Sequence, residues 1–352
     1  MWAKACGCTV QGMTATNLPG PAFRAYRPVT APLGRRRRWC ALATLVACVL
    51  LPPVTSSAAP LSARRAGSYA LAMPRPLSPF PGTALAGQGR WGPVGRPVDG
   101  RPVIYETTLQ PPQDPGTVAG VAWMDTKLLR PVLYSGSLSP GGYRWKYTAP
   151  VQGSAAQALV AAFNGGFQFP STDGGYFSEG KMVFPLRVGA ASLVIYKNGG
   201  AMIGEWGRDA RMTRNVVAVR QNLNLLVDHG QAVPGLNPND IWTWGPTLGG
   251  IPNVWRSALG ETASGAFVYV AGPSLTVVDL ASLLVRAGAV RAMELDINPY
   301  WTVFATYSPP TPTAAASPQN GADLLPAMMG TPSRFFDPAW DRDFIAMLAR
   351  PA

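Results

Sequence analysis

The sequence predicts a strand-rich α+β protein in which a few helices pack against the strands. Of its 352 residues, 47% are hydrophobic and 14% are charged, so the chain is long enough to bury a large core. The 38 glycines and 36 prolines indicate many turns rather than a helical bundle. Short apolar stretches separated by glycine-rich turns are typical of strands. We therefore expect a single domain, although the length would also permit two.

The first 59 residues have the pattern of a secretory signal segment with a long basic start. Four arginines at 35–38 precede the apolar run Trp39–Leu51, and small residues follow. This run is shorter than the roughly 20 residues of a membrane-spanning helix. We expect cleavage after Ala58 or Ala59, no stable membrane span in the mature chain, and a protein that is secreted or associated with the cell envelope. An uncleaved signal anchor, or a lipoprotein signal at Cys48, is the alternative.

Charge and cysteines also gather at this end of the chain. The formal net charge is +12, but residues 1–59 hold seven positive charges and no acid, so 12 less 7 leaves +5 for the rest. The rest contains no basic run, so we expect no nucleic-acid partner. All four cysteines precede residue 60, which excludes a disulfide framework and a cysteine metal site beyond it. The single histidine, His229, is predicted to be a solvated turn residue.

The remaining chain divides by composition. Residues 60–100 are rich in proline, glycine, alanine and arginine, and predict an extended, partly disordered lead. We expect the folded domain to span 101–352, with a low-complexity loop at 308–320. The apolar residues after that loop are too few for a core of their own, so they are expected to pack onto the main body.

Two helices and a series of strands are expected within the domain. Ser154 is the predicted N-cap of a short helix over 155–162. A second, amphipathic helix is expected over 275–287, ending before Gly288. The patterns predict strands at 103–109, 118–124, 132–134, 181–184, 192–196, 201–203, 216–219, 223–227 and 266–270, with a further strand leading into Glu294.

The first candidate site element is Asn164-Gly165-Gly166, between two phenylalanines. Glycines there permit positive φ and let backbone amides approach a ligand oxygen closely. The alternative is an ordinary helix C-cap and turn.

A second element places Arg256 and Ser257 beside Trp255. An arginine fork suits phosphate oxygens and aromatic faces suit sugar rings. In the alternative, Trp242, Trp244 and Trp255 are core residues and Arg256 pairs with a surface acid. Arg187 is a further candidate anion contact, with a surface salt bridge as its alternative.

The third element is the pair Glu294 and Asp296, beside Asn298. Residues two apart on a strand face one side, about 6.5–7 Å apart, near the spacing of inverting glycosidases. Repulsion between the two carboxylates would raise one pKa and produce an acid/base pair. In the alternative, both acids accept buried hydrogen bonds from arginine or from the backbone.

Taken in order, these stretches resemble the phosphodiester glycosidase family. Ala161–Phe167 looks like the family's Asn-Gly-Gly-Phe element, and Trp255–Gly260 is similar to its Arg-Thr-x-x-Gly element. Asp279–Leu284 and Gly288–Asp296 follow its last helix and its Asn-Leu-Asp-Gly-Gly strand. The resemblance extends from about Gly120 to Tyr307.

The resemblance implies a mixed α+β domain with a central sheet and a pocket where these loops meet. It places Asn164, Gly165, Gly166, Arg256, Ser257 and Asp296 at that pocket. This chain has Glu294 where the family usually has Asn, and Ile297-Asn298 where the family has Gly-Gly. These bulkier residues imply a changed ligand shape.

The function expected from these observations is an exported glycosidase-like hydrolase that releases a sugar from a glycosyl phosphodiester. Its partner would be a carbohydrate or sugar-phosphate substrate, for example in cell-envelope polymers, with Asp296 and Glu294 sharing acid/base work. A non-catalytic glycan-binding protein on the same scaffold is the alternative. A metal-dependent nuclease or phosphatase is a third reading. The sequence identifies neither a metal site nor a cofactor.

Overall fold

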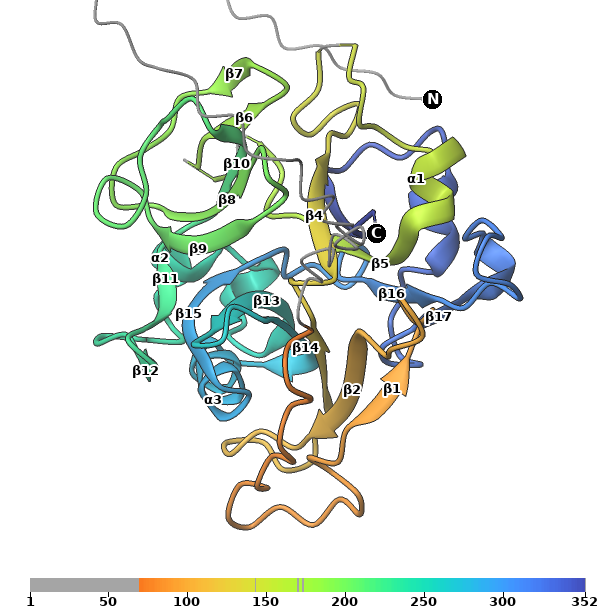
Figure 1. The fold of residues 1–352 in the computed structure, drawn as a ribbon. Helices are drawn as coiled ribbons and strands as arrows, with labels where there is room; N and C mark the ends of the chain where they lie inside the picture. Colours follow the sequence, from red (N-terminus) through yellow and green to blue (C-terminus); the bar gives the residue numbers. More distant parts are fainter. Residues whose placement is uncertain (1–69, 143, 170, 173, 352) are drawn as a thin grey trace, which may run out of the picture. The chain divides into compact units, whose positions relative to one another are not determined.

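The computed structural model describes residues 70–351 except 143, 170 and 173. The predicted signal segment and the start of the expected lead lie outside the described residues. Within the described part, strands dominate and only three α-helices occur, so the predicted α+β class is confirmed. Figure 1 shows how these strands and helices are arranged.

The largest sheet has eight strands in the order β1-β2-β3-β14-β13-β15-β11-β12. Its long central hairpin is β13–β14, and β15 pairs with the other side of β13. The bounds are β1 Gly92–Val94, β2 Ile104–Leu109, β3 Ala119–Met124, β11 Leu225–Asp228, β12 Gln231–Ala232, β13 Val254–Thr262, β14 Phe267–Leu275 and β15 Ala289–Glu294.

Two five-stranded sheets complete the fold, in the orders β7-β6-β10-β8-β9 and β17-β16-β5-β18-β4. All strand pairings in the three sheets are antiparallel among the described residues. The bounds are β4 Leu129–Tyr134, β5 Leu159–Asn164, β6 Tyr176–Ser178, β7 Lys181–Phe184, β8 Ala191–Tyr196, β9 Ala201–Glu205, β10 Val216–Gln221, β16 Phe304–Tyr307, β17 Gly321–Asp323 and β18 Phe344–Ala349.

The helices are α1 (Gly153–Ala158), α2 (Ile241–Trp244) and α3 (Val277–Arg286). Helix α3 is the amphipathic helix expected from the sequence. Its N-cap is Thr276, whose side chain forms a reciprocal capping box with Asp279. Its apolar face packs on the large sheet beside β13, β14 and β15 (Figure 1).

The other expected helix is shorter than predicted. Helix α1 ends at Ala158, and Leu159–Asn164 forms β5 instead. Every residue of β5 is buried, and the strand pairs with both β16 and β18. An apolar run of this length fits either a helix or a buried strand, and here the pairing on both sides decides for the strand.

Residues 70–100 differ from the extended lead predicted for 60–100. Strand β1 pairs with β2, and Leu77, Phe80 and Trp91 pack as partly buried side chains against the core under the large sheet. The backbone N–H of Leu71 donates to the carboxylate of Asp125. These contacts join the segment to the body of the protein, because its apolar residues find a surface that composition alone does not reveal.

The central hydrophobic core lies where the three sheets meet. It contains Leu259 and Met293 from the large sheet, Phe163 and Ile345 from the second five-stranded sheet, and Leu193 from the other. The ends of strands from all three sheets therefore come together at this core. The polar residues that follow those strand ends form the candidate site.

Candidate functional site

Chain segments far apart in the sequence meet at this junction. Asn164 is the last residue of β5, Glu294 is the last residue of β15, and Asp343 directly precedes β18. The backbone N–H of Gly165 donates to the carbonyl of Asp343 (3.0 Å), and the N–H of Asp296 donates to the carbonyl of Gly165 (3.1 Å). The loops after β5 and β15 are thus fixed to each other by backbone hydrogen bonds.

Asn164 and Ser257 form the hydrogen-bonded centre of the junction. The Asn164 Nδ2 donates to Ser257 Oγ (3.0 Å) and to the Gly165 carbonyl (3.0 Å). Its Oδ1 accepts from Tyr269 Oη (2.8 Å) and from the N–H of Val303 (3.1 Å). Because both polar atoms of this buried amide are used inside the protein, Asn164 positions the neighbouring strands.

The two glycines leave room for a buried ion pair. A Cβ on Gly165 would come 2.0 Å from Oδ2 of Asp343, and a Cβ on Gly166 would come 2.9 Å from Cζ of Arg220. Neither glycine has a φ in the left-handed region. Close approach, rather than the positive φ that the sequence also allowed, accounts for both positions.

Three ion pairs occupy the junction. Arg256 pairs with Glu294 at 2.5 Å, Arg220 pairs with Asp343 at 2.8 Å, and Arg342 pairs with Asp296. All six side chains are at most 6% exposed. Burying six charged groups costs several kcal/mol per ion before the pairing offsets it, so this is a feature that stability alone does not call for.

Glu294 is the most perturbed acid of the group. Burial raises its pKa to about 7; the Arg256 cation opposes that rise and the nearby Asp296 adds to it. Its Oε1 accepts from Arg256, whereas Oε2 is buried with no hydrogen-bond partner among the described residues. A carboxyl with one unsatisfied oxygen and a pKa near 7 can carry a proton at neutral pH.

Asp296 lies in a more polar setting. Its Oδ2 accepts from Arg342, and its Oδ1 accepts from the N–H of Asn298 at 3.0 Å. Burial raises the pKa of Asp296, while Arg342 and the Asn298 N–H oppose the rise. The arrangement with both acids hydrogen-bonded to arginine or backbone, posed as the alternative from the sequence, is the one observed.

The Arg256 guanidinium faces the interior. Its Nε donates to the Leu275 carbonyl, one terminal nitrogen donates to both the Trp244 carbonyl and Glu294, and the other donates to the Pro252 carbonyl. Only 1% of the Arg256 side chain is exposed, so its guanidinium binds Glu294 and is closed to solvent. The alternative in which Arg256 pairs with a surface acid is wrong, because its partner Glu294 is fully buried.

Residues 157–296 match the family model of the phosphodiester glycosidases. This segment belongs to the phosphodiester glycosidase family. The match contains Asn164, Gly165, Arg256 and Glu294, and it ends at Asp296, the last residue before the segment in which this chain departs from the family pattern. No curated protein matches the sequence.

The solved structures that are similar to this chain include one protein from zebrafish and one from Synechocystis. One is the catalytic domain of zebrafish N-acetylglucosamine-1-phosphodiester alpha-N-acetylglucosaminidase, auto-inhibited by its pro-peptide, with 15% identity, a TM-score of 0.44, and coverage of 74% of this chain and 88% of that one. The other is a hypothetical protein from Synechocystis, with 13% identity, a TM-score of 0.40, and coverage of 74% and 64%.

The segment after the family match packs against the site rather than leaving it open. Ile297 is buried against Phe167 and Leu223. The ring of Trp301 lies 4.7 Å from the guanidinium of Arg342, the residue that pairs with Asp296. Bulky side chains thus occupy the region where family members usually have two glycines.

Two predicted contacts lie outside the cluster. Arg187 is exposed, and it is its backbone N–H and carbonyl that bond to the side chain of Gln221. Asn298 is also exposed, and its Oδ1 accepts the N–H of Tyr300 within its own turn. The cluster therefore brings together Asn164, both glycines, Arg256, Ser257, Glu294 and Asp296, without these two side chains.

Four site residues were missed by sequence reasoning: Arg220, Asn222, Arg342 and Asp343. Asn222 accepts the N–H of Phe167 and donates to the carbonyl of Glu294. The sequence does contain a signal for these residues. Arg220 and Asn222 lie at the end of the apolar strand β10, and Arg342 and Asp343 directly precede the apolar strand β18, just as Glu294 and Asp296 lie at the end of β15. Buried polar side chains are costly unless they are hydrogen-bonded or paired, so polar residues at the ends of apolar strands are candidates for a site.

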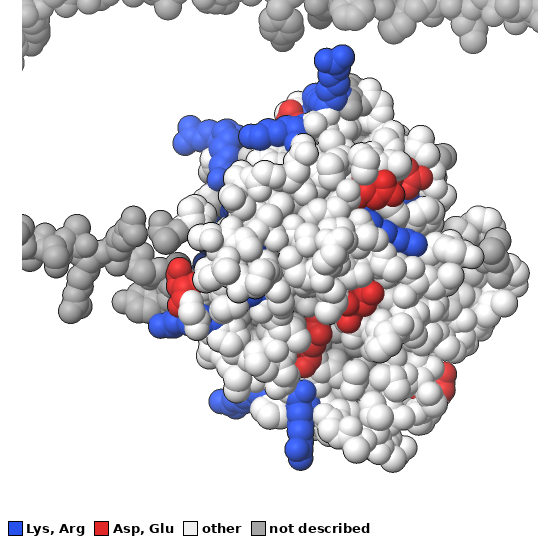
Figure 2. Space-filling view, turned by 90° about the vertical axis from the view of Figure 1, so that its right-hand side faces the viewer, with Lys and Arg blue, Asp and Glu red and all other residues white. Residues whose placement is uncertain are grey.

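His229 is confirmed as a turn residue, since its side chain is 81% exposed. Among the described residues, no group of three or more His, Cys, Asp and Glu side chains gathers to hold a metal ion. No helix in this part of the chain is long and apolar enough to cross a membrane. On the face shown in Figure 2, the described basic side chains form small separate groups on a largely uncharged surface.

Proposed function

We propose that this protein is an exported glycosidase-type hydrolase that releases a sugar from a glycosyl phosphodiester. In the reaction, water adds to the anomeric carbon, the carbon–oxygen bond to phosphate breaks, and the phosphate departs as a monoester. The observation that carries the proposal is the pair of carboxylates, Glu294 and Asp296, held by arginines in the family segment.

The two acids have environments suited to different tasks. Glu294, with a pKa raised to about 7 and one unpartnered oxygen, is the group that holds a proton near neutral pH. Asp296 receives hydrogen bonds from Arg342 and from a backbone N–H, which favour its ionised form. We assign proton transfer to Glu294, and stabilisation of the anomeric carbon or activation of water to Asp296.

The arginines have separate parts in this account. Arg342, stacked on Trp301 and paired with Asp296, is the cation we assign to the substrate phosphate. Arg256, first considered for that contact from the sequence, acts instead as a positioning residue because its donors hold Glu294 and interior carbonyls. Asn164 and Ser257 likewise position the loops.

The proposal is tested by measuring sugar release from a panel of glycosyl phosphodiesters. We expect the purified protein to hydrolyse at least one of them and the Asp296→Asn variant to be slower by about 100-fold or more, the range of an acid/base contribution. Asp323→Asn is the control, because Asp323 is a half-buried acid outside the junction whose pKa is also raised by burial. Equal rates in the parent and Asp296→Asn proteins would remove Asp296 from the chemistry.

A second candidate function has its own supporting observation. Both acids are paired with arginine and almost completely buried, an arrangement that also suits a protein that binds glycan without turning it over. Glycan binding that persists in Asp296→Asn, with no turnover by the parent protein, would favour this function.

The cellular setting belongs to the same proposal. The basic, apolar and small-residue succession in residues 1–59 supports export, and an exported enzyme of this type would meet sugar-phosphate linkages in envelope polymers.

A further inference from the structure

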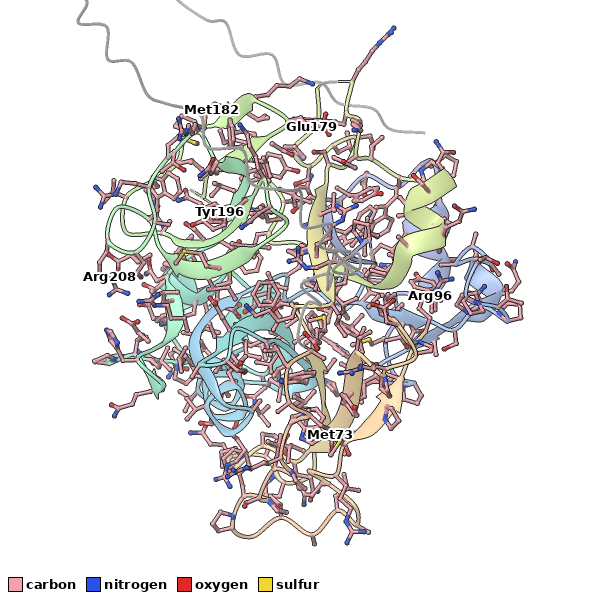
Figure 3. The ribbon with its side chains drawn as sticks, viewed as in Figure 1. Met73, Arg96, Glu179, Met182, Tyr196 and Arg208 are labelled. Carbon is pink, nitrogen blue, oxygen red and sulfur yellow. The ribbon has the colours of Figure 1, made fainter. Side chains whose placement is uncertain are left out.

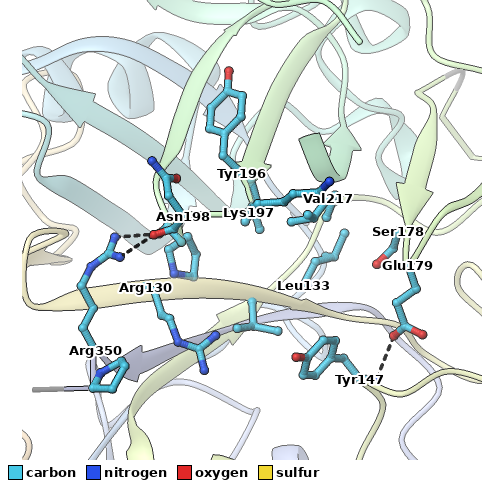
Figure 4. A pocket seen from close by; sticks show the side chains of 16 residues that line it. Arg130, Leu133, Tyr147, Ser178, Glu179, Tyr196, Lys197, Asn198, Val217 and Arg350 are labelled. Atoms are coloured by element: carbon cyan, nitrogen blue, oxygen red, sulfur yellow. Dashed lines mark hydrogen bonds between the residues drawn. The ribbon is translucent and has the colours of Figure 1, made fainter. Parts of the chain in front are cut away.

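A groove of about 660 Å³ lies away from the candidate site. Strand β4 forms one side, while the end of β8, its turn toward β9 and part of β10 form the other (Figure 4). None of the residues assigned above to the acid pair or its arginines lines this groove. The residues that line the groove are therefore separate from those of the proposed hydrolase site.

The floor of the groove is apolar. Leu133 of β4, Ile195 of β8 and Ala218 of β10 belong to the central core and are nearly fully buried. Tyr147 adds an aromatic ring on the β4 side (Figure 4). Such a floor suits the hydrocarbon or ring part of a small molecule.

Two cations at the rim have no ion pair in the described part of the chain. Arg130 projects from β4 and Lys197 from the turn after β8, and Figure 4 shows them on opposite sides of the groove. Lys197 is exposed and Arg130 is half-buried. Both charges are consequently free to meet a ligand.

The third cation, Arg350, has a different role. Its guanidinium donates to the carbonyls of Thr126 and Leu129 on one side and of Asn198 and Gly199 on the other. It thereby fixes the β8–β9 turn beside the start of β4. Burial, and next the neighbouring charge of Arg130, lowers the pKa of Arg350, so these two cations lie close enough to repel each other.

The single acid in the lining does not neutralise this charge. Glu179, on the β6–β7 turn (Figure 3), accepts the backbone N–H groups of Lys146 and Tyr147 at 2.9 and 2.8 Å. Its carboxylate thus stabilises the loop that carries Tyr147. The groove keeps a net positive rim above an apolar floor.

We propose that this groove binds an organic phosphate, with the phosphate between Arg130 and Lys197 and the attached ring or alkyl part on the floor. A phosphate monoester carries close to two negative charges at neutral pH, which matches the two free cations. Arginine presents a fork that fits phosphate oxygens, and lysine adds a point charge. A neutral sugar or alcohol lacks the group that this rim would recognise.

Calorimetric titration with hexyl phosphate, glucose 1-phosphate and inorganic phosphate tests the proposal. We expect one of the organic phosphates to bind more tightly than inorganic phosphate, because only the organic molecules also cover the floor. A preference for hexyl phosphate identifies a lipid-like source, and a preference for glucose 1-phosphate identifies a sugar phosphate. Either preference supports the groove, whereas the absence of binding, or equal binding of all three, overturns it.

Variants locate the binding. Arg130→Met with Lys197→Met should weaken the affinity about 100-fold, roughly tenfold for each lost charge-assisted hydrogen bond. Arg211→Met with Arg214→Met removes the same charge from exposed positions outside the groove and should leave the affinity unchanged. Equal losses in the two double variants would contradict the assignment. Thermal melting of all variants confirms that they are folded.

A last arm separates this site from the proposed catalytic one. In the Asp296→Asn protein, the tighter-binding organic phosphate should still bind with unchanged affinity. A changed affinity in that variant, in either direction, would place the phosphate at the acid pair and overturn the groove proposal, because Asp296 pairs with Arg342 there. Since no turnover is measured, failure of the hydrolase proposal leaves this test intact.

Discussion

At the scale of single residues, Glu294 has the setting that most needs an explanation. One of its oxygens pairs with Arg256, and the other has no hydrogen-bond partner among the described residues. A carboxylate removed from water is costly unless all its oxygens are satisfied, so the neutral form gains relative stability. The raised pKa is therefore a consequence of how the strand ends meet.

This setting predicts a pH dependence of stability. The pKa of Glu294 rises from 4.5 to about 7 on folding, so the unfolded chain loses this proton at lower pH than the folded one. The stabilising contribution is fully present below pH 4.5 and is lost as the pH rises to about 7. Glu294→Gln should make this decline shallower, as measured by urea unfolding between pH 4.5 and 7.5.

Glu294→Gln should remove only part of the decline in stability with pH, because burial also raises the pKa of Glu106 to about 7. Glu106→Gln should remove a separate share of the same decline. If the stability of the Glu294→Gln variant falls with pH as steeply as that of the parent protein, the Glu294 carboxyl is ionised over the whole range from pH 4.5 to 7.5.

The sequence anticipated part of the site at this scale. Asn164, Arg256, Ser257 and both acids were expected together, and the structure joins them through hydrogen bonds and ion pairs. Arg342 was not expected, because it reaches Asp296 only after β18 pairs with β5, and no local pattern encodes that pairing.

At the scale of elements, the decisive contact is the approach of the end of β5 to the start of β18. Gly165 follows β5, and the space where its side chain would lie is filled by Asp343. Asp343 in turn pairs with Arg220 at the end of β10. One missing side chain thus lets elements of two sheets share a buried ion pair.

Substitution of that glycine should be costly. Gly165→Ala would place Cβ 2.0 Å from the Asp343 carboxylate, and we expect a loss of about 1–3 kcal/mol or more in the free energy of unfolding. Gly92→Ala in β1 is the matched control, because its Cβ would meet only one atom, at 4.0 Å. Urea unfolding compares the two, and equal stability would contradict the packing account.

Elements were predictable where the local signals agreed. Helix α3 was expected from its periodicity and its terminal glycine, and it forms with the capping box of Thr276 and Asp279. The stretch 159–162 was expected to be helical and instead forms most of strand β5. Its apolar residues satisfy both periodicities, so neighbouring strands rather than local propensity decide its conformation.

At the scale of the whole molecule, the α+β class followed from composition and pattern, but the division into three sheets did not. The family resemblance implied a central sheet but not how many sheets surround it. Which strands pair depends on contacts between distant segments, such as β3 with β14 and β4 with β18. The junction of the sheets, and hence the polar centre, could not be located from local sequence.

Export is a prediction that rests on the pattern of residues 1–59. Expression in a secreting host should yield an extracellular protein whose N-terminus begins after Ala58 or Ala59, as measured by intact mass and N-terminal sequencing. A protein that stays inside the cell with residues 1–59 attached would contradict it. A lipid-modified N-terminus at Cys48 would instead support the lipoprotein alternative.

The central claim is that the buried acid pair performs the chemistry. Its most direct test is the rate of sugar release from a glycosyl phosphodiester by the parent protein, by Glu294→Gln and Asp296→Asn, and by Glu106→Gln and Asp323→Asn as controls. We expect losses of about 100-fold or more in at least one of the first two, with near-parent rates in both controls. Parent-like rates in both Glu294→Gln and Asp296→Asn would contradict the claim.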